Sequence, residues 1–417
     1  MDRSLTPERS WAEGGARPLA FARYLSAYTL SIFGAELIHS ALLLYAATVL
    51  HASGSALGWF SAASQIPYAL SLTAGFLADR YSRRAILIAS DLCRAALALG
   101  IGATMLFMPA PIVLLVSVAF LLACFTLGYE ITASAFLPEI VPRSRLTSAN
   151  GALFSAHSGG TAVATFVAGF LLVALGSGGL LLSIAAIFIA AVALLAWAVR
   201  GSHRADNDQP LRISWRGILA GLSILREHRA LARLTVYAAF VSMLTSFALV
   251  ATLVFLDRVA SLSPGSIGIL LGLPSVGGIA AALLIKPVRR ALSFAATLRW
   301  AGVLGPLGWL IVALSPARYP TVAGVGLLIV GVATAVYNVS AVSYRQATCP
   351  GELQGRLAGA LKLCAWGGMP IGAALGGWLT DELGARTVLQ VTFVCLMCCF
   401  PLLLSASRLA AQGSESV

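Results

Sequence analysis

The sequence predicts an all-α membrane protein whose twelve transmembrane helices form two pseudo-symmetric six-helix bundles. Of the 417 residues, 59% are hydrophobic and only 11% are charged. Soluble domains contain about 45–50% apolar residues, so this composition is typical of a chain surrounded by lipid. Twelve apolar windows and an internal repeat complete the prediction.

The apolar windows are each long enough to cross a bilayer. A helix needs about 20 predominantly apolar residues to span the hydrocarbon core. Charged or polar seams separate the windows, and these seams define the loops. The predicted spans are 22–50, 56–78, 85–108, 111–136, 147–175, 178–199, 231–256, 264–285, 296–315, 320–344, 355–379 and 385–407.

Lysine and arginine gather on one side of these spans. With the N-terminus inside, 23 of the 28 basic residues fall in inside loops and tails, 3 fall outside and 2 lie within helices. The positive-inside rule then places both termini in the cytoplasm, as expected for a multi-pass protein of a bacterial inner membrane. The net charge of +12 is scattered over short loops. We therefore expect the lipid bilayer, and no nucleic acid, as a partner.

A long polar stretch over residues 200–230 separates the first six spans from the last six. We predict an N-terminal bundle over 1–199, a cytoplasmic linker over 200–230 and a C-terminal bundle over 231–417. Apolar residues at helical spacing from Trp215 to Leu225 favour an amphipathic helix on the inner membrane surface. A tether without fixed structure is the alternative.

The two halves of the chain repeat each other. "PRSRLTSANGAL" from Pro142 and "PGELQGRLAGAL" from Pro350 are 208 residues apart, as are "GGTAVATFVAGF" and "GGMPIGAALGGW" further on. One register held over roughly thirty residues pairs the span 147–175 with the span 355–379. The residues of the second pair of segments expected to serve close helix packing are Gly159, Gly160, Gly367, Gly368 and Pro370.

A charged motif, "GFLADRYSRR", runs from Gly75 to Arg84 at the end of the span 56–78. With the six-plus-six arrangement and the basic central loop, this motif resembles the major facilitator superfamily. The segments "FLPEIVPRSRLTSANG", "GLSILREHRALARL" and "GRLAGALKLCAWGGMPIGAALGGWL" resemble, more narrowly, its macrolide-efflux and enterobactin-exporter branch.

The resemblance implies alternating access around a central cavity near the bilayer midplane. It also implies a cytoplasmic latch in which Asp79 meets the N-terminus of the helix over 355–379, because a helix N-terminus favours a carboxylate. The alternative is a topological stop signal in which Asp79 only reduces repulsion among the arginines. The residues of this gating motif are Gly75, Asp79, Arg80, Arg83 and Arg84.

One feature departs from the resemblance. Drug exporters of the superfamily usually carry a Gly-Pro antiporter motif in their fifth helix, whereas the stretch from Gly159 to Phe170 has no proline. Antiport is therefore less strongly indicated than the fold.

Ionisable residues within the spans are candidates for proton coupling, because charge in hydrocarbon is costly and usually functional. Glu36 lies near the middle of the span 22–50, with His39 three residues on. A polar pair that closes a helix contact is the alternative. Glu130, in the span 111–136, is the second coupling candidate; it is equally suited to a structural pair with Arg94 or Lys362.

A mixed apolar and hydrogen-bonding lining is predicted for the central cavity, which would suit amphipathic organic solutes. Helix packing is the alternative for each residue, and the long stem of the one lysine also allows it to reach the inner surface. The candidates are Gln65, Phe240, Met243, Phe247, Tyr337, Asn338 and Lys362.

We expect a secondary exporter of a small amphipathic molecule, a siderophore or drug-like compound, driven by proton exchange. An importer or lysolipid-flipping transporter and a non-transporting sensor or partner protein are the alternatives. HExxH, nucleotide-loop, GxSxG and zinc-finger patterns are missing from the sequence. We therefore expect no enzyme activity, no metal and no cofactor, with the proton gradient as energy source. A monomer is compatible with the sequence.

Overall fold

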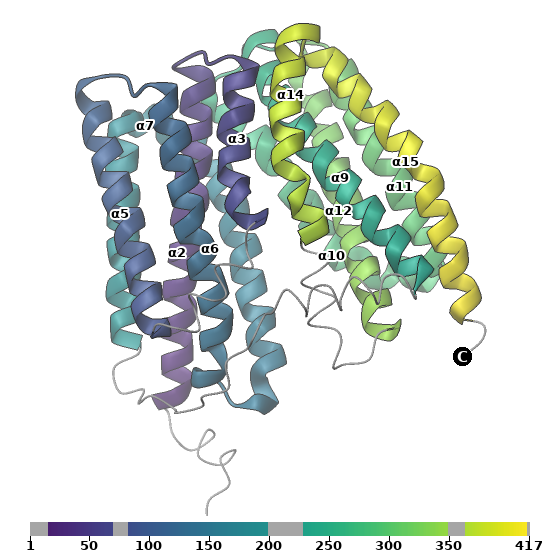
Figure 1. The fold of residues 1–417 in the computed structure, drawn as a ribbon, viewed down its shortest axis with the longest axis horizontal. Helices are drawn as coiled ribbons and strands as arrows, with labels where there is room; N and C mark the ends of the chain where they lie inside the picture. The colour runs from purple at the N-terminus through teal and green to yellow at the C-terminus, as the bar shows by residue number, and fades with distance from the viewer. Residues whose placement is uncertain (1–15, 70–81, 199–227, 349–362, 415–417) are drawn as a thin grey trace, which may run out of the picture. The chain divides into compact units, whose positions relative to one another are not determined.

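The computed structural model describes residues 16–69, 82–198, 228–348 and 363–414, and within these ranges it contains helices joined by short turns (Figure 1). Several predictions lie outside the described residues: the interfacial helix of the linker, and Gly75, Asp79, Arg80 and Lys362.

The helices of the first half follow the predicted spans. They are α2 (Ala16–Thr48), α3 (Gly54–Ala69), α5 (Arg83–Phe107), α6 (Ile112–Ile140) and α7 (Leu146–Ala198), with a 3₁₀ turn η1 (Arg143–Arg145) before α7. Helix α7 covers two predicted spans. At Gly176 its backbone has φ 66° and ψ 170°, values that interrupt helical geometry and that glycine adopts without a steric penalty. One apolar stretch thus supplies two crossings.

The second half continues the pattern. Its helices are α9 (Arg229–Val254), the π-helical extension η2 (Phe255–Val259), α10 (Pro264–Ala291), α11 (Phe294–Leu314), α12 (Pro320–Thr348), α14 (Met369–Leu383) and α15 (Ala385–Ser414).

Every predicted span overlaps a described helix, two of them only in part. Within the described ranges, nine helices are long and apolar enough to cross a membrane, and α7 is one of them although it covers two spans. Helices α3 and α14 are the described parts of two further spans and contain 16 and 15 residues. The predicted all-α membrane fold is confirmed.

Large apolar side chains stand exposed along the helices. Phe107 is 86% exposed, Leu283 75% and Val113 73%. Contiguous apolar surface is rare on soluble monomers, whereas hydrocarbon tails solvate it without cost. The exposed faces of these helices therefore suit a lipid environment.

The chain divides into two compact units. One unit comprises Met1–Leu42, Leu70–Ala110 and Leu121–Arg212, and the other comprises Leu43–Ala69, Pro111–Phe120 and Ile213–Val417. Helix α3 groups with the second unit because it packs along α14 and α9 (Figure 1). The predicted linker lies outside the described residues, so the domain boundaries at 199 and 231 stay a prediction.

Aromatic residues join α2 to α6 in the first unit. The Tyr24 hydroxyl donates a 2.9 Å hydrogen bond to the Ala133 carbonyl, and the Tyr24 ring packs 5.6 Å from that of Phe136. Tyr28 stacks on Tyr129 with the ring centroids 6.1 Å apart. A buried phenol without a partner is costly, so the tyrosine–carbonyl bond helps to set how α2 lies on α6.

Backbone-to-backbone crossings dominate the second unit. A Cβ atom built on Gly308 of α11 would lie 2.7 Å from the Gly326 carbonyl of α12, and one on Gly326 would lie 2.6 Å from the Gly308 carbonyl. On α14, Gly372 and Gly376 meet the backbone of α9 at Met243 and Phe247 in the same way. Small residues let helices approach this closely, which in lipid gains van der Waals contact.

The glycines singled out in the sequence are less closely packed than predicted. Among the described residues, a side chain at Gly159 or Gly367 would meet open space, and one at Gly160 would make only ordinary contact at 3.7 Å. Gly368 is tighter, since its Cβ would lie 3.3 Å from the Met243 Cβ. Pro370 lies in the first turn of α14, where a missing N–H is tolerated. The closest contacts fall further along α14 than the repeat indicated.

Adjacent glycines of α10 provide a matched test of these crossings. A Cβ on Gly277 would collide with the Leu328 carbonyl of α12, whereas one on Gly278 would lie 3.9 Å from the Ala335 Cβ. We expect Gly277→Ala to lower the thermal unfolding midpoint in detergent, with Gly278→Ala neutral or slightly stabilising because alanine is the better helix former. Equal midpoints for the two variants would contradict the α10–α12 crossing.

Candidate functional site

Three ionisable side chains from three helices of the first unit lie close together. The His157 Nε2 atom on α7 is 3.5 Å from the Glu130 Oε1 atom on α6, and both side chains are partly exposed. Glu36 on α2 lies within electrostatic range of both. His39 follows one turn after Glu36 and is half-buried. We call Glu36, Glu130 and His157 the acidic cluster.

The composition of the acidic cluster suits proton exchange. Carboxyl and imidazole groups are the side chains that most often act as proton donors and acceptors near neutral pH. When such groups lie close together, the charge on one alters the electrostatic energy of the others. The acidic cluster therefore has the composition and the spacing of a candidate site for proton coupling.

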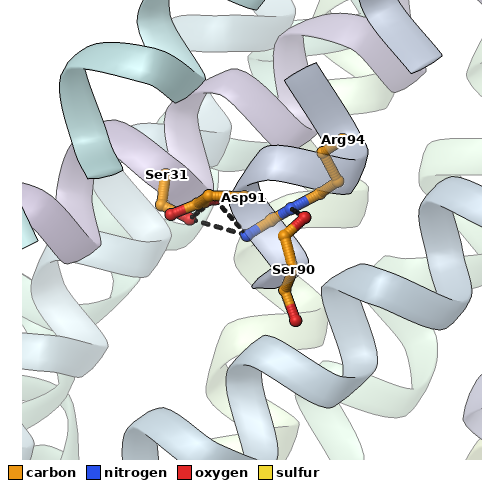
Figure 2. Close-up of polar contacts among 4 residues, drawn as sticks. All are labelled: Ser31, Ser90, Asp91 and Arg94. Atoms are coloured by element: carbon orange, nitrogen blue, oxygen red, sulfur yellow. Dashed lines mark hydrogen bonds and ion pairs between the residues drawn. The ribbon is translucent and has the colours of Figure 1, made fainter. Parts of the chain in front are cut away.

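A second, fully buried network links α2 and α5 (Figure 2). The Arg94 guanidinium pairs with Asp91 at 2.5 Å and donates to the Ser31 hydroxyl at 2.9 Å, while the Ser31 hydroxyl donates to Asp91 at 2.9 Å. Both charged side chains are 0% exposed. We call Ser31, Asp91 and Arg94 the buried triad.

Aromatic rings enclose the arginine of the buried triad. The Arg94 guanidinium carbon lies 4.7 Å from the Tyr129 ring centroid on α6 and 4.9 Å from that of Phe188 on α7. Cations are attracted to aromatic faces, most strongly where water is absent. The triad and its rings thus draw on four helices: α2, α5, α6 and α7.

Some buried polar atoms of the triad and of the tyrosine beside it lack a hydrogen-bond partner. Within the described ranges, Asp91 Oδ2, Arg94 Nη1 and the Tyr129 hydroxyl are buried and have no hydrogen-bond partner from the protein. A buried ion pair offsets its desolvation cost only when its remaining polar atoms are also satisfied. The pair therefore carries an energetic cost that packing elsewhere in the unit must offset.

Of the gating motif, Arg83 and Arg84 are among the residues that the structure describes. The Arg83 Nη1 atom at the start of α5 pairs with Glu139 of α6 at 2.7 Å and donates to the Ala135 carbonyl at 3.0 Å. Arg84 is exposed at the same end of the helix. Arg83 thus joins two helices of one unit, and the predicted latch of Asp79 stays a prediction.

The predicted cavity residues have different surroundings. The Gln65 side-chain carbonyl accepts a 2.8 Å hydrogen bond from the Ser246 hydroxyl of α9, and its amide donates to the Ser61 carbonyl. Phe240 and Asn338 are exposed, and Met243 is half-buried against α14. Phe247 is buried where α9 crosses α14.

Tyr337 takes part in helix packing. Its hydroxyl donates a 2.6 Å hydrogen bond to the Leu234 carbonyl, and its ring lies 5.2 Å from that of Tyr237 in a buried cluster of α9, α11, α12 and α15. The structure therefore places Tyr337 in the role that the sequence left as the alternative.

Sequence reasoning missed the buried triad. It treated Arg94 as a partner for Glu130, yet Asp91 stands three residues earlier in the same apolar span. Opposite charges three residues apart share one helix face, so the spacing Asp91-x-x-Arg94 was the available signal. Ser31 carried no signal, because a serine in a membrane helix commonly bonds only its own backbone.

The chain matches a known protein family over most of its length. The family profile of the Major Facilitator Superfamily matches residues 24–368 of the chain. The chain belongs to the Major Facilitator Superfamily. This family consists of transporters, so the protein is a membrane-embedded transporter of small molecules.

Solved structures of major facilitator transporters share its fold. The nucleoside transporter NupG is 13% identical, with a TM-score of 0.74 over 93% of this chain and 98% of that one. A bacterial homologue of the human lysosomal transporter Spinster is 15% identical, with a TM-score of 0.74 over 97% and 98%. A bacterial homologue of the iron transporter ferroportin is 16% identical, with a TM-score of 0.70 over 93% and 98%. A search of curated protein sequences found no match.

Breaking the buried triad should destabilise this major facilitator protein strongly. Removing one charge of a buried pair leaves the other uncompensated, at a cost of about 3–5 kcal/mol. We expect Asp91→Asn and Arg94→Gln each to lower the thermal unfolding midpoint in detergent, and the double variant to recover part of the loss.

Arg83→Gln is the matched control for this test. The Arg83–Glu139 pair is 30% and 33% exposed, and exposed pairs contribute about 0–1 kcal/mol. Additive losses for Asp91→Asn and Arg94→Gln would show that the two charges do not compensate each other.

Proposed function

We propose that this major facilitator protein is a proton-coupled exporter of a small amphipathic organic molecule, a siderophore or a drug-like compound. The observation that carries the proposal is the acidic cluster, which brings two carboxyl groups and an imidazole from three helices together inside membrane-spanning segments. Ionisable groups at such depth mark proton relays and ion pathways in transporters.

In this proposal, the acidic cluster couples the movement of protons to the movement of the solute. If a proton and the solute bind preferentially to opposite conformations of the cycle, the gradient of one drives the movement of the other. Glu36 is the coupling residue in this scheme, with Glu130 and His157 as the partners whose charge state it senses. His39, one turn further along α2, is a candidate relay.

Export as the direction, and siderophores or drug-like compounds as the cargo, are supported by the resemblance to the macrolide-efflux and enterobactin-exporter branch. The solved structures named above are under 25% identical and support the fold alone. Exposed Phe240 and Asn338, with half-buried Gln65 and Met243, offer the mixture of apolar and polar groups that amphipathic solutes need.

Everted membrane vesicles with an acid interior test the proposal. A fluorescent amphipathic dye and a panel of hydroxamate and catecholate siderophores serve as probes, and the collapse of the pH gradient on adding each probe reports coupling. We expect uptake into the vesicles, lost at least tenfold in Glu36→Gln, because glutamine cannot exchange a proton.

Solute exchange without a gradient separates coupling from binding. Glu36→Gln should retain exchange of preloaded against external solute, since this step needs no net proton movement. Glu382→Gln, at an exposed carboxylate at the end of α14, is the matched control and should transport normally. Uptake only into right-side-out vesicles would indicate an importer or a lipid-flipping protein, and transport of no probe by the wild type would indicate a sensor.

A further inference from the structure

A carboxylate at the end of α14 lies directly on the start of α3. Asp381 accepts hydrogen bonds from the Gly54 backbone N–H at 2.7 Å, the Ser55 backbone N–H at 2.7 Å and the Ser55 hydroxyl at 2.6 Å. The first N–H groups of a helix have no partner within the helix, and the helix dipole places positive charge there. Asp381 therefore satisfies two such donors with charge-assisted bonds, which are stronger than neutral ones.

Below these bonds, the two helices touch through their backbones. A Cβ atom on Gly58 of α3 would lie 2.6 Å from the Ala373 carbonyl of α14, and one on Gly54 would lie 2.7 Å from the Gly377 carbonyl. From the other side, a Cβ on Gly377 would lie 2.8 Å from the Gly58 Cα. At these glycines the two helices approach backbone to backbone, so the bonds of Asp381 and the glycine contacts act on the same pair of helix ends.

A basic residue holds the segment just before α3. The Arg258 Nη2 atom, in η2, donates to the Ala52 carbonyl at 2.5 Å and to the His51 carbonyl at 3.3 Å. Arg258 therefore binds acceptors of the turn that precedes α3, while Asp381 binds donors of the helix itself. Two side chains of opposite charge thus bind neighbouring parts of the chain, the segment that joins α2 to α3 and the start of α3.

All of these groups belong to the outer side in the topology predicted from the basic residues. The turn at 51–55 joins the first two predicted spans, Arg258 follows the span 231–256, and Asp381 follows the span 355–379. Helix α3 comes from the first half of the sequence and α14 from the second. In a cycle that alternately opens each side, elements of the two halves must part on the side that opens.

We infer that Asp381 is the gating residue of an outer latch, whose bonds to the start of α3 close the outer ends of α3 and α14 and break when the outer side opens. The inference rests on the proposed transport cycle. It also mirrors the predicted inner latch, in which Asp79, after the span 56–78, meets the start of the helix over 355–379. In the outer latch, Asp381 at the end of that second helix meets the start of α3, the helix of the first span.

The charge of Asp381 suits a latch that does not depend on pH. Asp381 is exposed, and its partial desolvation raises the pKa of this carboxyl. The bonds from Ser55 and Gly54 and the nearby Arg258 outweigh that effect, so the pKa lies below its ordinary value. A lowered pKa means that the latch is fully present above the ordinary pKa of about 3.9 and is lost only as pH falls through the lowered value. The latch should therefore remain charged when the outside is acidic.

Cysteine labelling from each face tests the latch. In a protein whose seven cysteines are replaced, Ser61→Cys is a reporter, because Ser61 is 5% exposed and lies seven residues inward from the start of α3. Right-side-out vesicles are treated with a membrane-impermeant thiol reagent. We expect Asp381→Ala to raise the labelling rate from outside roughly three- to tenfold, with a smaller rise for Asp381→Asn.

Three controls make the result decisive. Glu382→Gln, one residue further on and exposed, should label as the wild type does. Gly58→Leu forces the same crossing apart without touching Asp381, and should raise labelling and so prove that opening is detectable. Ala98→Cys, buried in α5, replaces the reporter in a parallel set and should stay unlabelled unless the whole protein has loosened.

Two outcomes would overturn the latch. One is wild-type labelling in Asp381→Ala and Asp381→Asn while Gly58→Leu labels faster; the other is faster labelling only in everted vesicles, which would place Asp381 on the inner side. Labelling needs neither a solute nor a gradient. Failure of the proposed export would therefore leave this result readable, and failure of the latch would leave the transport assay unaffected.

The outside pH provides a further prediction. The thiolate is the species that reacts, so each labelling rate is divided by that of a fully exposed introduced cysteine at the same pH. This ratio should be the same at pH 7.5 and pH 5.5 in the wild type, since Asp381 stays ionised at both. The other titratable groups of this region are Glu382 on the same helix, and His51 and Asp257, which lie within electrostatic range of each other beside Arg258. The pair of measurements is repeated in His51→Gln. If the labelling ratio rises at pH 5.5 and the rise persists in His51→Gln, Asp381 itself titrates in this range. That result would contradict a latch that does not depend on pH.

Discussion

The free-energy cost of an uncompensated charge in hydrocarbon governs where the ionisable side chains of this protein lie. Arg94 shows the constraint at its strongest, since its guanidinium is fully buried, paired with Asp91 and enclosed by the rings of Tyr129 and Phe188. Such a pair is rarely more stabilising than apolar packing would be, so stability is a weak reason to retain it. Its geometric effect is clearer, because four helices must hold their positions for the charges to stay compensated.

The carboxylates of this protein fall into two groups that differ in the number of hydrogen-bond donors around them. Asp91 and Asp381 each accept several hydrogen bonds, from Arg94 and Ser31 in one case and from the start of α3 in the other. Carboxylates held in this way serve to fix a structure or a state. Glu130 instead meets an imidazole at 3.5 Å and is partly exposed, and Glu36 lies near both. Weak pairing and access to solvent are what an exchanging proton requires.

Glycine contacts and the proposed latch are two aspects of the same helix crossing. Along α14, glycines face α9 on one side at Gly372 and Gly376, and face α3 at Gly377. Close backbone contact at these glycines reduces the number of side chains that interlock, so less repacking is needed when such helices separate and return. The three hydrogen bonds that Asp381 accepts add directional interactions, which the van der Waals contacts at the glycines do not provide.

Composition and periodicity were sufficient to predict the all-α membrane fold and the twelve spans, because a helix in lipid has to satisfy its backbone internally and must be about 20 apolar residues long. They also singled out Glu36 and Glu130, since a lone charge in an apolar span is conspicuous. What they did not reveal is which side chains meet: Glu130 lies beside His157 and not beside Arg94, Tyr337 bonds a carbonyl within a packed cluster, and Asp381 reaches the start of α3 across more than 300 residues of chain. Those pairings depend on how helices distant in sequence rotate and cross, and only the tertiary structure decides that.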